Sequence, residues 1–262
     1  MTTVGRTILL ALTLAFAANS FFACRSSRIR NRSNEVNLPR VMLWAWERPE
    51  DLRFLNSRRY GVAALAQTLV LKDDDVIQKP RHHPLLVPPD VKVVAVTRIE
   101  SQRSKDQRPT LSASQTSRVA QLIRKSLELP NVYGVQVDFD ATTSEREFYR
   151  ALLGDLRATL PDETPLSITA LASFCVGDRW LKDLPVDEAI PMAFRMGTDS
   201  TKIRGMLADG NDFRGELCQR SYGIALDEPL KARFDPTRRV YVFNSRSWKE
   251  SDLEELEERV RQ

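Results

Sequence analysis

Two aspartates, Asp138 and Asp140, close an apolar stretch of the sequence at a spacing that suits acid–base chemistry. On a β-strand, residues two apart share one face, so both carboxylates and the amide of Gln136 point to the same side. The two backbones then lie roughly 6.5 to 7 Å apart, close enough for one charge to raise the pKa of the other carboxyl group. Such a pair can act on a glycosidic bond or hold the hydroxyl groups of a sugar. The alternative is that one aspartate pairs with Arg98 or Arg195 and only closes the end of the strand.

The residues around this pair have the pattern of a barrel strand. Val135, Val137 and Phe139 occupy the face opposite the acids, as expected where the outer face of a strand packs on helices. Eight short runs rich in β-branched and apolar residues alternate with helical or turn-like segments, which is typical of βα units. The runs cover residues 41–46, 61–71, 91–100, 132–141, 166–173, 188–196, 222–226 and 239–244. We therefore predict an α/β fold, a single-domain (β/α)8 barrel of the TIM type, over residues 39–262.

Four segments between or after these runs have the composition of longer helices. They cover residues 112–128, 144–160, 198–208 and 250–261, so the other helices of the barrel must be short or missing. Ser144 and Glu147 have the spacing of a capping box at the start of the second of these helices. No Gly-x-Gly-x-x-Gly motif or phosphate loop follows the first run, which argues against an open dinucleotide-binding sheet.

Polar and aromatic residues collect where the predicted strands end. In barrels of parallel strands the site lies at these carboxyl ends, so we predict a polar pocket there. Its catalytic candidates are Asp138 and Asp140, and its ligand-binding candidates are Trp44, Trp46, Glu47, Arg98, Glu100, Gln136, Thr169, Arg195, Asp227 and Asn244. Trp44 and Trp46 share a strand face and can form a platform for a sugar ring, although core packing explains at least one of them. Arg98 and Arg195 can bind a carboxylate of a ligand or neutralise the aspartates.

The composition limits the partners and cofactors. The chain has 39 basic and 35 acidic residues, a formal charge of +4, which is too small to predict binding of nucleic acid. Its two histidines, His82 and His83, are adjacent in a proline-rich loop, and its three cysteines show no Cys-x-x-Cys spacing. We therefore predict no metal site and no cofactor. The alternative is an oxygen-ligated divalent ion between Asp138, Asp140 and Glu100.

The first residues indicate export. An uncharged run from Thr7 to Ala23, rich in Leu, Ala and Phe, resembles a secretory signal peptide, and the segment that ends in Cys24 resembles the cleavage box of bacterial lipoproteins. We predict a signal peptide or lipoprotein signal over 1–23, a disordered tether over 24–38 and lipidation at Cys24. The protein is then expected in the cell envelope at the periplasmic face, bound to the membrane by an N-terminal anchor or lipid.

The residues after this run leave another interpretation open. Arginines stand at positions 25, 28, 30 and 32, and basic residues beside an apolar segment tend to stay on the cytoplasmic side. The run is then an uncleaved anchor, which would suit a cytoplasmic-facing protein with a small-molecule pocket.

The remaining cysteines are expected to stay reduced. Cys175 follows the fifth run and Cys218 precedes the seventh, which places them at opposite ends of a barrel. A disulfide needs Cα atoms within about 7 Å of each other. We therefore predict no bridge between them, even in an exported protein.

Four motifs resemble a bacterial family known only as domain of unknown function 3142. They are LWAWERP at 43–49, GVQVDFDA at 134–141, SITALAS at 167–173 and PMAFRMG at 191–197. A more distant resemblance is to family 18 glycoside hydrolases, whose barrels carry Asp-x-Asp-x-Glu at the end of the fourth strand. Asp138 and Asp140 match its aspartates, whereas Thr142 stands at the place of the glutamate that protonates the leaving oxygen.

The family 18 resemblance implies a barrel with a carbohydrate-type pocket centred on Asp138 and Asp140. It does not imply the family mechanism, because Thr142 cannot donate the proton. Any acid must come from the aspartate pair, or from Glu47 or Glu100 reaching across the mouth. We expect a glycoside-hydrolase-like barrel of the cell envelope that binds a glycan and, if it has an acid, hydrolyses it. The alternative is a non-catalytic barrel that recognises a polysaccharide or an envelope partner.

Overall fold

The computed structural model describes residues 37–261 of the chain. The predicted signal segment, Cys24 and most of the predicted tether lie outside the described residues. Within them, no helix is long and apolar enough to cross a lipid bilayer.

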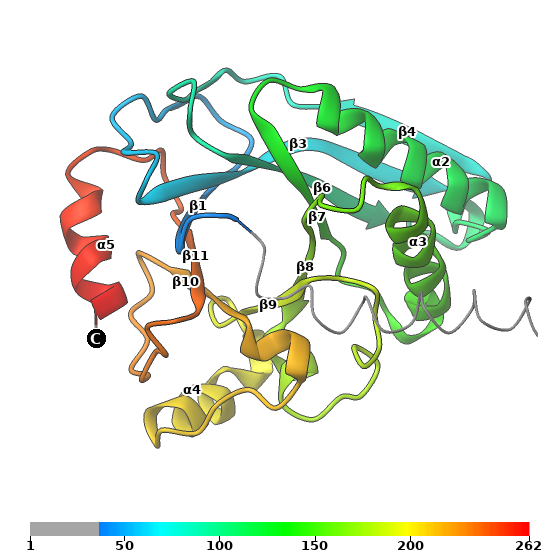
Figure 1. Ribbon diagram of the computed structural model, residues 1–262. Helices are drawn as coiled ribbons and strands as arrows, with labels where there is room; N and C mark the ends of the chain where they lie inside the picture. Colours follow the sequence, from blue (N-terminus) through cyan, green and yellow to red (C-terminus); the bar gives the residue numbers. More distant parts are fainter. Residues whose placement is uncertain (1–36, 262) are drawn as a thin grey trace, which may run out of the picture. The chain divides into compact units, whose positions relative to one another are not determined.

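Eight parallel strands of the described chain close into a barrel (Figure 1). In order around the ring they are β1 (Val41–Ala45), β3 (Tyr60–Lys72), β6 (Val93–Ser101), β7 (Val132–Asp138), β8 (Leu166–Leu171), β9 (Glu188–Met192), β10 (Ser221–Ala225) and β11 (Arg239–Phe243). The ring is closed because β1 pairs with both β3 and β11. The predicted (β/α)8 barrel is confirmed, and each strand coincides with one of the eight predicted runs.

The helices are distributed unevenly around this ring. They are α2 (Ala113–Lys125), α3 (Arg146–Thr159), α4 (Ser200–Ala208) and α5 (Asp252–Arg261), which correspond to the four predicted segments. The connection from β3 to β6 instead carries β4 (Asp75–Pro80), which pairs antiparallel with the long strand β3. The two short strands β2 (Glu50–Asp51) and β5 (Leu85–Leu86) pair with each other. These three strands were not predicted, because they are short or largely exposed and show no clear alternation.

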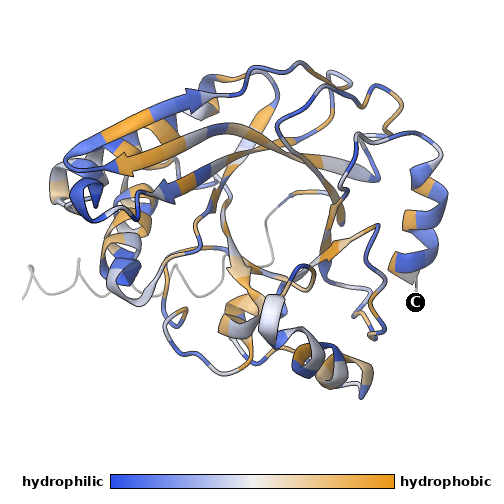
Figure 2. Cartoon of the chain, turned by 180° about the vertical axis from the view of Figure 1, so that it is seen from behind, coloured by the Kyte–Doolittle hydropathy of each residue, from blue (hydrophilic) through white to orange (hydrophobic). Residues whose placement is uncertain are grey.

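The strands bury side chains on both faces and so produce two cores. Along β1, Met42 and Trp44 belong to the cluster inside the barrel, whereas Val41, Leu43 and Ala45 belong to the cluster between the strands and the outer segments. Figure 2 shows the strands of the ring as largely hydrophobic and α5 as mixed, with many hydrophilic residues. Because both faces are buried, the strands carry apolar residues on both faces, while successive side chains point alternately into and out of the barrel.

Cys175 and Cys218 form a disulfide, with their Cα atoms 5.8 Å apart, so the prediction of no bridge was wrong. Cys175 ends the 3₁₀ helix η5 (Ala172–Cys175), and Cys218 lies in the 3₁₀ helix η7 (Glu216–Gln219). Both short helices pack against β9, and both cysteines are buried in the outer core. The prediction assumed that each loop residue stays at the end of the barrel where its strand starts or stops. Instead, both segments fold over the outside of β9, which is only five residues long.

The predicted capping box is also displaced by two residues. The carboxylate of Glu145 accepts hydrogen bonds from the backbone N–H and the hydroxyl of Thr142, both at 2.7 Å. Thr142 is therefore the N-terminal cap, and the chain enters α3 through the 3₁₀ helix η4 (Thr143–Glu145). The sequence contains both a Ser-x-x-Glu and a Thr-x-x-Glu spacing, and the structure uses the earlier one.

Candidate functional site

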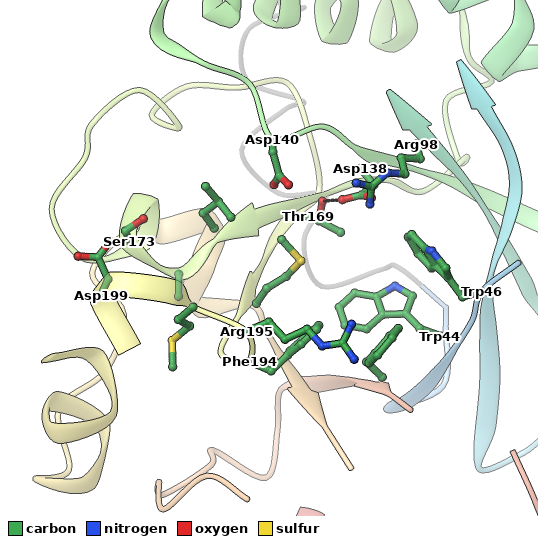
Figure 3. A pocket seen from close by; sticks show the side chains of 15 residues that line it. Trp44, Trp46, Arg98, Asp138, Asp140, Thr169, Ser173, Phe194, Arg195 and Asp199 are labelled. Atoms are coloured by element: carbon green, nitrogen blue, oxygen red, sulfur yellow. Dashed lines mark hydrogen bonds and ion pairs between the residues drawn. The ribbon is translucent and has the colours of Figure 1, made fainter. Parts of the chain in front are cut away.

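A pocket of about 350 Å³ opens where the barrel strands end, as predicted (Figure 3). It is lined by Trp44, Trp46, Arg98, Asp138, Asp140, Thr169, Leu171, Ala172, Ser173, Met192, Phe194, Arg195, Met196, Asp199 and Phe243. These residues come from β1, β6, β7, β8, β9 and β11 or from the segments that follow them. The pocket therefore brings together both predicted catalytic candidates and five of the predicted ligand-binding residues.

Asp138 is the last residue of β7 and is held by both neighbouring strands. Thr169 on β8 donates its hydroxyl to Oδ1 of Asp138 at 2.6 Å, and Arg98 on β6 donates to Oδ2 at 3.2 Å. The side chain is buried. Burial raises the pKa of Asp138, the contacts with Thr169 and Arg98 oppose this, and the charge of Asp140 adds to it, so that the pKa lies above its usual value.

Asp140 stands two residues beyond the end of the strand and is exposed at the pocket. Its carboxylate interacts electrostatically with Arg98 and Asp138. Within residues 37–261 it forms no hydrogen bond or ion pair that would hold it against the wall. Asp140 is therefore the member of the aspartate pair that is accessible to a ligand, while Asp138 lies beneath it as a fixed, buried group.

The two tryptophans have different roles in this arrangement. Trp44 is 2% exposed and donates its indole N–H to Oε1 of Gln136 at 2.8 Å, so it belongs to the barrel interior and forms the floor of the pocket. Its ring fits beside Gly223, where a Cβ atom would lie 3.1 Å from the ring. Trp46 is half-buried on the wall, with its ring 6.4 Å from that of Phe243. Trp46 is thus the tryptophan that offers a ring face to a ligand.

Arg98 neutralises the acids at the end of β7. It is ion-paired with Asp138 at 3.2 Å and with Glu100 at 3.0 Å, and its Cζ lies 6.0 Å from the ring centre of Trp46. Burial lowers the pKa of the guanidinium, but the carboxylates of Asp138, Glu100 and Asp140 outweigh burial and raise it. Arg98 therefore has the structural role that the sequence left open for it.

Three predicted ligand-binding residues lie beside or beneath the pocket instead of lining it. Gln136 is fully buried in the barrel interior below the floor. Glu47 accepts hydrogen bonds from the backbone N–H groups of His82 and His83 at 3.1 and 3.3 Å. Glu100 is occupied by its ion pair at the rim. They support the walls, and the two predicted glutamates do not reach across the mouth.

The two remaining predicted residues lie away from the pocket. Asp227 is exposed beyond the end of β10. Asn244 is 2% exposed and donates to Oδ2 of Asp252 at 3.3 Å, so it fixes the start of α5. The alternation along β11 explains this error, because Tyr241 and Phe243 face the barrel interior, and the residue that follows Phe243 must face outward.

The sequence-based site missed most of the apolar lining and two polar residues. The missed residues are Leu171, Ala172, Ser173, Met192, Phe194, Met196, Asp199 and Phe243. The prediction selected polar residues at strand ends. In the structure, the residues on the inward face of each strand line the pocket whether they are polar or apolar. For Phe243 the signal was present, since it lies two residues after the inward-facing Tyr241.

The aspartate pair is not part of a cluster of metal-ligating side chains in the described part of the chain. Across residues 37–261, no group of three or more His, Cys, Asp or Glu side chains is arranged to hold a metal ion. Glu100 is turned to Arg98 and Asp138 is bonded to Thr169, which leaves Asp140 as the one unbonded carboxylate of the proposed trio.

Comparisons with known proteins give one family match and similar solved structures. The family described as Domain of unknown function (DUF3142) matches residues 90–184, a stretch that contains two of the four motifs named above. No curated protein matches the chain. A solved structure of a family GH18 chitinase from Chromobacterium violaceum is similar at 12% identity and a TM-score of 0.44, covering 79% of this chain and 78% of the chitinase. The chitinase domain of the spore coat protein CotE from Clostridium difficile is similar at 12% identity and a TM-score of 0.39, covering 80% of this chain and 66% of that one.

Proposed function

We propose that this protein binds a glycan in the pocket at the barrel mouth and works as an exported protein of the cell envelope. One observation carries the proposal: a half-buried tryptophan ring, Trp46, and the exposed carboxylate of Asp140 line the same pocket. A sugar ring has an apolar face that suits an aromatic ring and an edge of hydroxyl groups that suits a carboxylate. The volume of about 350 Å³ falls within the range of small-molecule sites.

The rigidity of the pocket supports binding. The floor is fixed by the bond from Trp44 to Gln136, and the acidic wall is fixed by the contacts of Asp138 with Thr169 and Arg98. These hydrogen bonds within the protein restrict the side chains, so little conformational entropy is lost when a ligand binds.

The disulfide supports export. Buried disulfides persist in oxidising compartments such as the bacterial periplasm and are rare in the cytosol. The bridge between Cys175 and Cys218 therefore agrees with the signal segment expected before Cys24. It speaks against the cytoplasmic-facing alternative, and lipidation at Cys24 remains part of the proposal.

Hydrolysis of the glycan is the second candidate function. Two-carboxylate glycosidases need one protonated and one ionised acid, and burial raises the pKa of Asp138 above its usual value. Asp140 is the member of the pair that can contact the glycan. Against hydrolysis, Thr142 is held in the capping box by Glu145, so the acid of family 18 has no counterpart at that position.

The test is a binding screen of the purified protein against neutral and acidic oligosaccharides from envelope and exopolysaccharides, with mass analysis of every mixture for products. We expect binding that weakens in D140N and persists in D209N, which changes an exposed aspartate outside the pocket. Products that vanish in both D138N and D140N would identify a glycosidase, and binding without products a recognition protein. Failure to bind any glycan would refute the proposal.

A further inference from the structure

Arg195 enters the pocket from an unusual backbone conformation. It follows β9, and its φ is 50°, in the left-handed region that non-glycine residues rarely adopt. Among the described non-glycine residues with positive φ, it is the one that lines this pocket. Conformations of this kind are costly and recur at binding sites, where the surrounding structure has to hold them.

The carboxylate of Glu228 holds this conformation. Its Oε2 accepts a hydrogen bond from the backbone N–H of Arg195 at 3.0 Å, and its Oε1 is bonded to the guanidinium of Arg204 on α4. Arg204 in turn donates to the carbonyl of Pro229 at 2.8 Å. Glu228 is thus committed to the backbone of Arg195 and to another arginine, and it does not neutralise the side chain of Arg195.

The side chain of Arg195 is fixed by aromatic rings. Its Cζ lies 4.8 Å from the ring centre of Phe243, and Phe243 stacks on Phe194 with ring centres 5.4 Å apart and 7° between the planes. Figure 3 shows the guanidinium extending into the pocket. Among residues 37–261, no carboxylate forms an ion pair with Arg195, whereas Arg98 in the same pocket is paired with Asp138.

We propose that Arg195 binds the carboxylate of an acidic sugar, so that the glycan of this pocket is a uronate-containing polysaccharide. This inference rests on the glycan-binding function proposed above. A guanidinium held with its face on a ring keeps its edge N–H groups free, and two of them match the two oxygens of a planar carboxylate. A single negative charge fits better than a doubly charged phosphate, because Asp140 and Asp199 line the same pocket.

The experiment compares oligouronides with their carboxyl-reduced counterparts, which keep the rings, linkages and length but lose the charge. Isothermal titration calorimetry of the full chain should show the uronide binding about tenfold more tightly than its reduced counterpart. R195M should lose this preference. R58M, which removes an exposed arginine beside the amino end of β3, should keep it. Added salt should weaken binding of the uronide and leave the reduced sugar unaffected.

A second variant separates the role of the guanidinium from effects on folding. R195K retains the charge without the paired donors and should keep part of the preference for the uronide. Equal affinity of the wild type for the uronide and its reduced counterpart would overturn the inference and leave glycan binding intact. A stronger, Arg195-dependent preference for sulfated oligosaccharides would overturn the assignment to a carboxylate. Absence of binding to both neutral and acidic glycans would overturn the proposed function itself.

Discussion

Thr169 and Asp138 are joined across adjacent strands by a 2.6 Å hydrogen bond whose acceptor is a buried carboxylate. The bond fixes the last side chain of β7 against β8, at the depth where the barrel core gives way to the pocket. Because Arg98 holds the other oxygen from β6, three neighbouring strands share one acid. The position of Asp138 is therefore a property of the barrel wall, whereas Asp140 belongs to the loop above it.

Replacing Asp138 with asparagine changes how stability depends on pH. Burial is the main reason that the folded protein has a raised pKa at Asp138, so the folded state holds this proton more tightly than the unfolded state. Ionisation of Asp138 then costs stability as the pH rises from the ordinary value of 3.8 through the raised folded value. We expect D138N to lack this loss and to gain on the wild type by about 1.4 kcal/mol per unit of pKa shift across that window.

Urea denaturation at a series of pH values measures this difference. D138N also loses the ion pair with Arg98, which shifts its free energy of unfolding at every pH. The informative quantity is therefore how the difference in free energy of unfolding between D138N and the wild type changes with pH. D209N, at an exposed position, should run parallel to the wild type. Parallel curves for D138N and the wild type would contradict the raised pKa.

Removing the ring of Trp46 should weaken binding of the glycan without unfolding the barrel. The ring is half-buried, and its loss as W46A removes the stacking surface, which we expect to cost about 1 kcal/mol, a roughly fivefold loss of affinity. Y133A is the matched control, because Tyr133 is an exposed aromatic residue near the amino end of β7, outside the pocket. Titration of each variant with the tightest ligand of the screen gives the comparison, and equal losses for the two variants would remove Trp46 from the site.

Loss of the disulfide should destabilise the protein and loosen one wall of the pocket. The bridge closes a separation of 43 residues, and bridges of this kind contribute about 2 to 4 kcal/mol. C175S/C218S should therefore melt several degrees below the wild type. Hydrogen exchange should also speed up in η5, which carries two residues that line the pocket. C24S is the control, since it removes the third cysteine and should leave both measurements unchanged.

A methyl group added at Gly223 should strain the barrel interior. Its Cβ atom would lie 2.9 Å from the carbonyl oxygen of Pro191 and 3.1 Å from the ring of Trp44. We expect G223A to lose about 1 to 3 kcal/mol of stability in chemical denaturation. Gly154 on α3 has no atom within 4 Å of such a Cβ, so G154A should instead gain about 0.5 to 1 kcal/mol. The opposite signs of the two substitutions are the test.

The alternation of the strands was readable from the sequence because it depends on local properties. Inward and outward residues along β1 and β7 follow the period of two, and this was enough to predict the barrel and to place Asp138, Asp140, Trp44 and Trp46 at one mouth. The prediction that Asn244 lines the pocket failed on the same principle, since its polarity was given more weight than its register, which places Phe243 there instead.

The contacts that were not predicted are those between distant segments. Cys175 and Cys218 meet because two loops fold over the outside of β9, and no local pattern encodes that path. The different contacts of Arg98 and Arg195 were not predicted either. Both arginines lie near the carboxyl end of a predicted strand, but Arg98 pairs with Asp138 and Arg195 lies against Phe243, and these partners come from separate parts of the chain. The residue types in the sequence were enough to identify several side chains of the site. The residues that each of them contacts could be read only from the packed structure.

The closing pair of the barrel sets the order in which the pocket can be assembled. Val41 on β1 pairs with Val240 on β11, so the ring stays open until nearly the whole chain is available. Trp46 follows the first of these strands and Phe243 ends the last, and their rings meet only on closure. Pairing over such a sequence separation slows folding, because the loop entropy is lost before the contacts form. The candidate pocket is therefore complete only after β11 has joined β1, and we expect it to form late in folding.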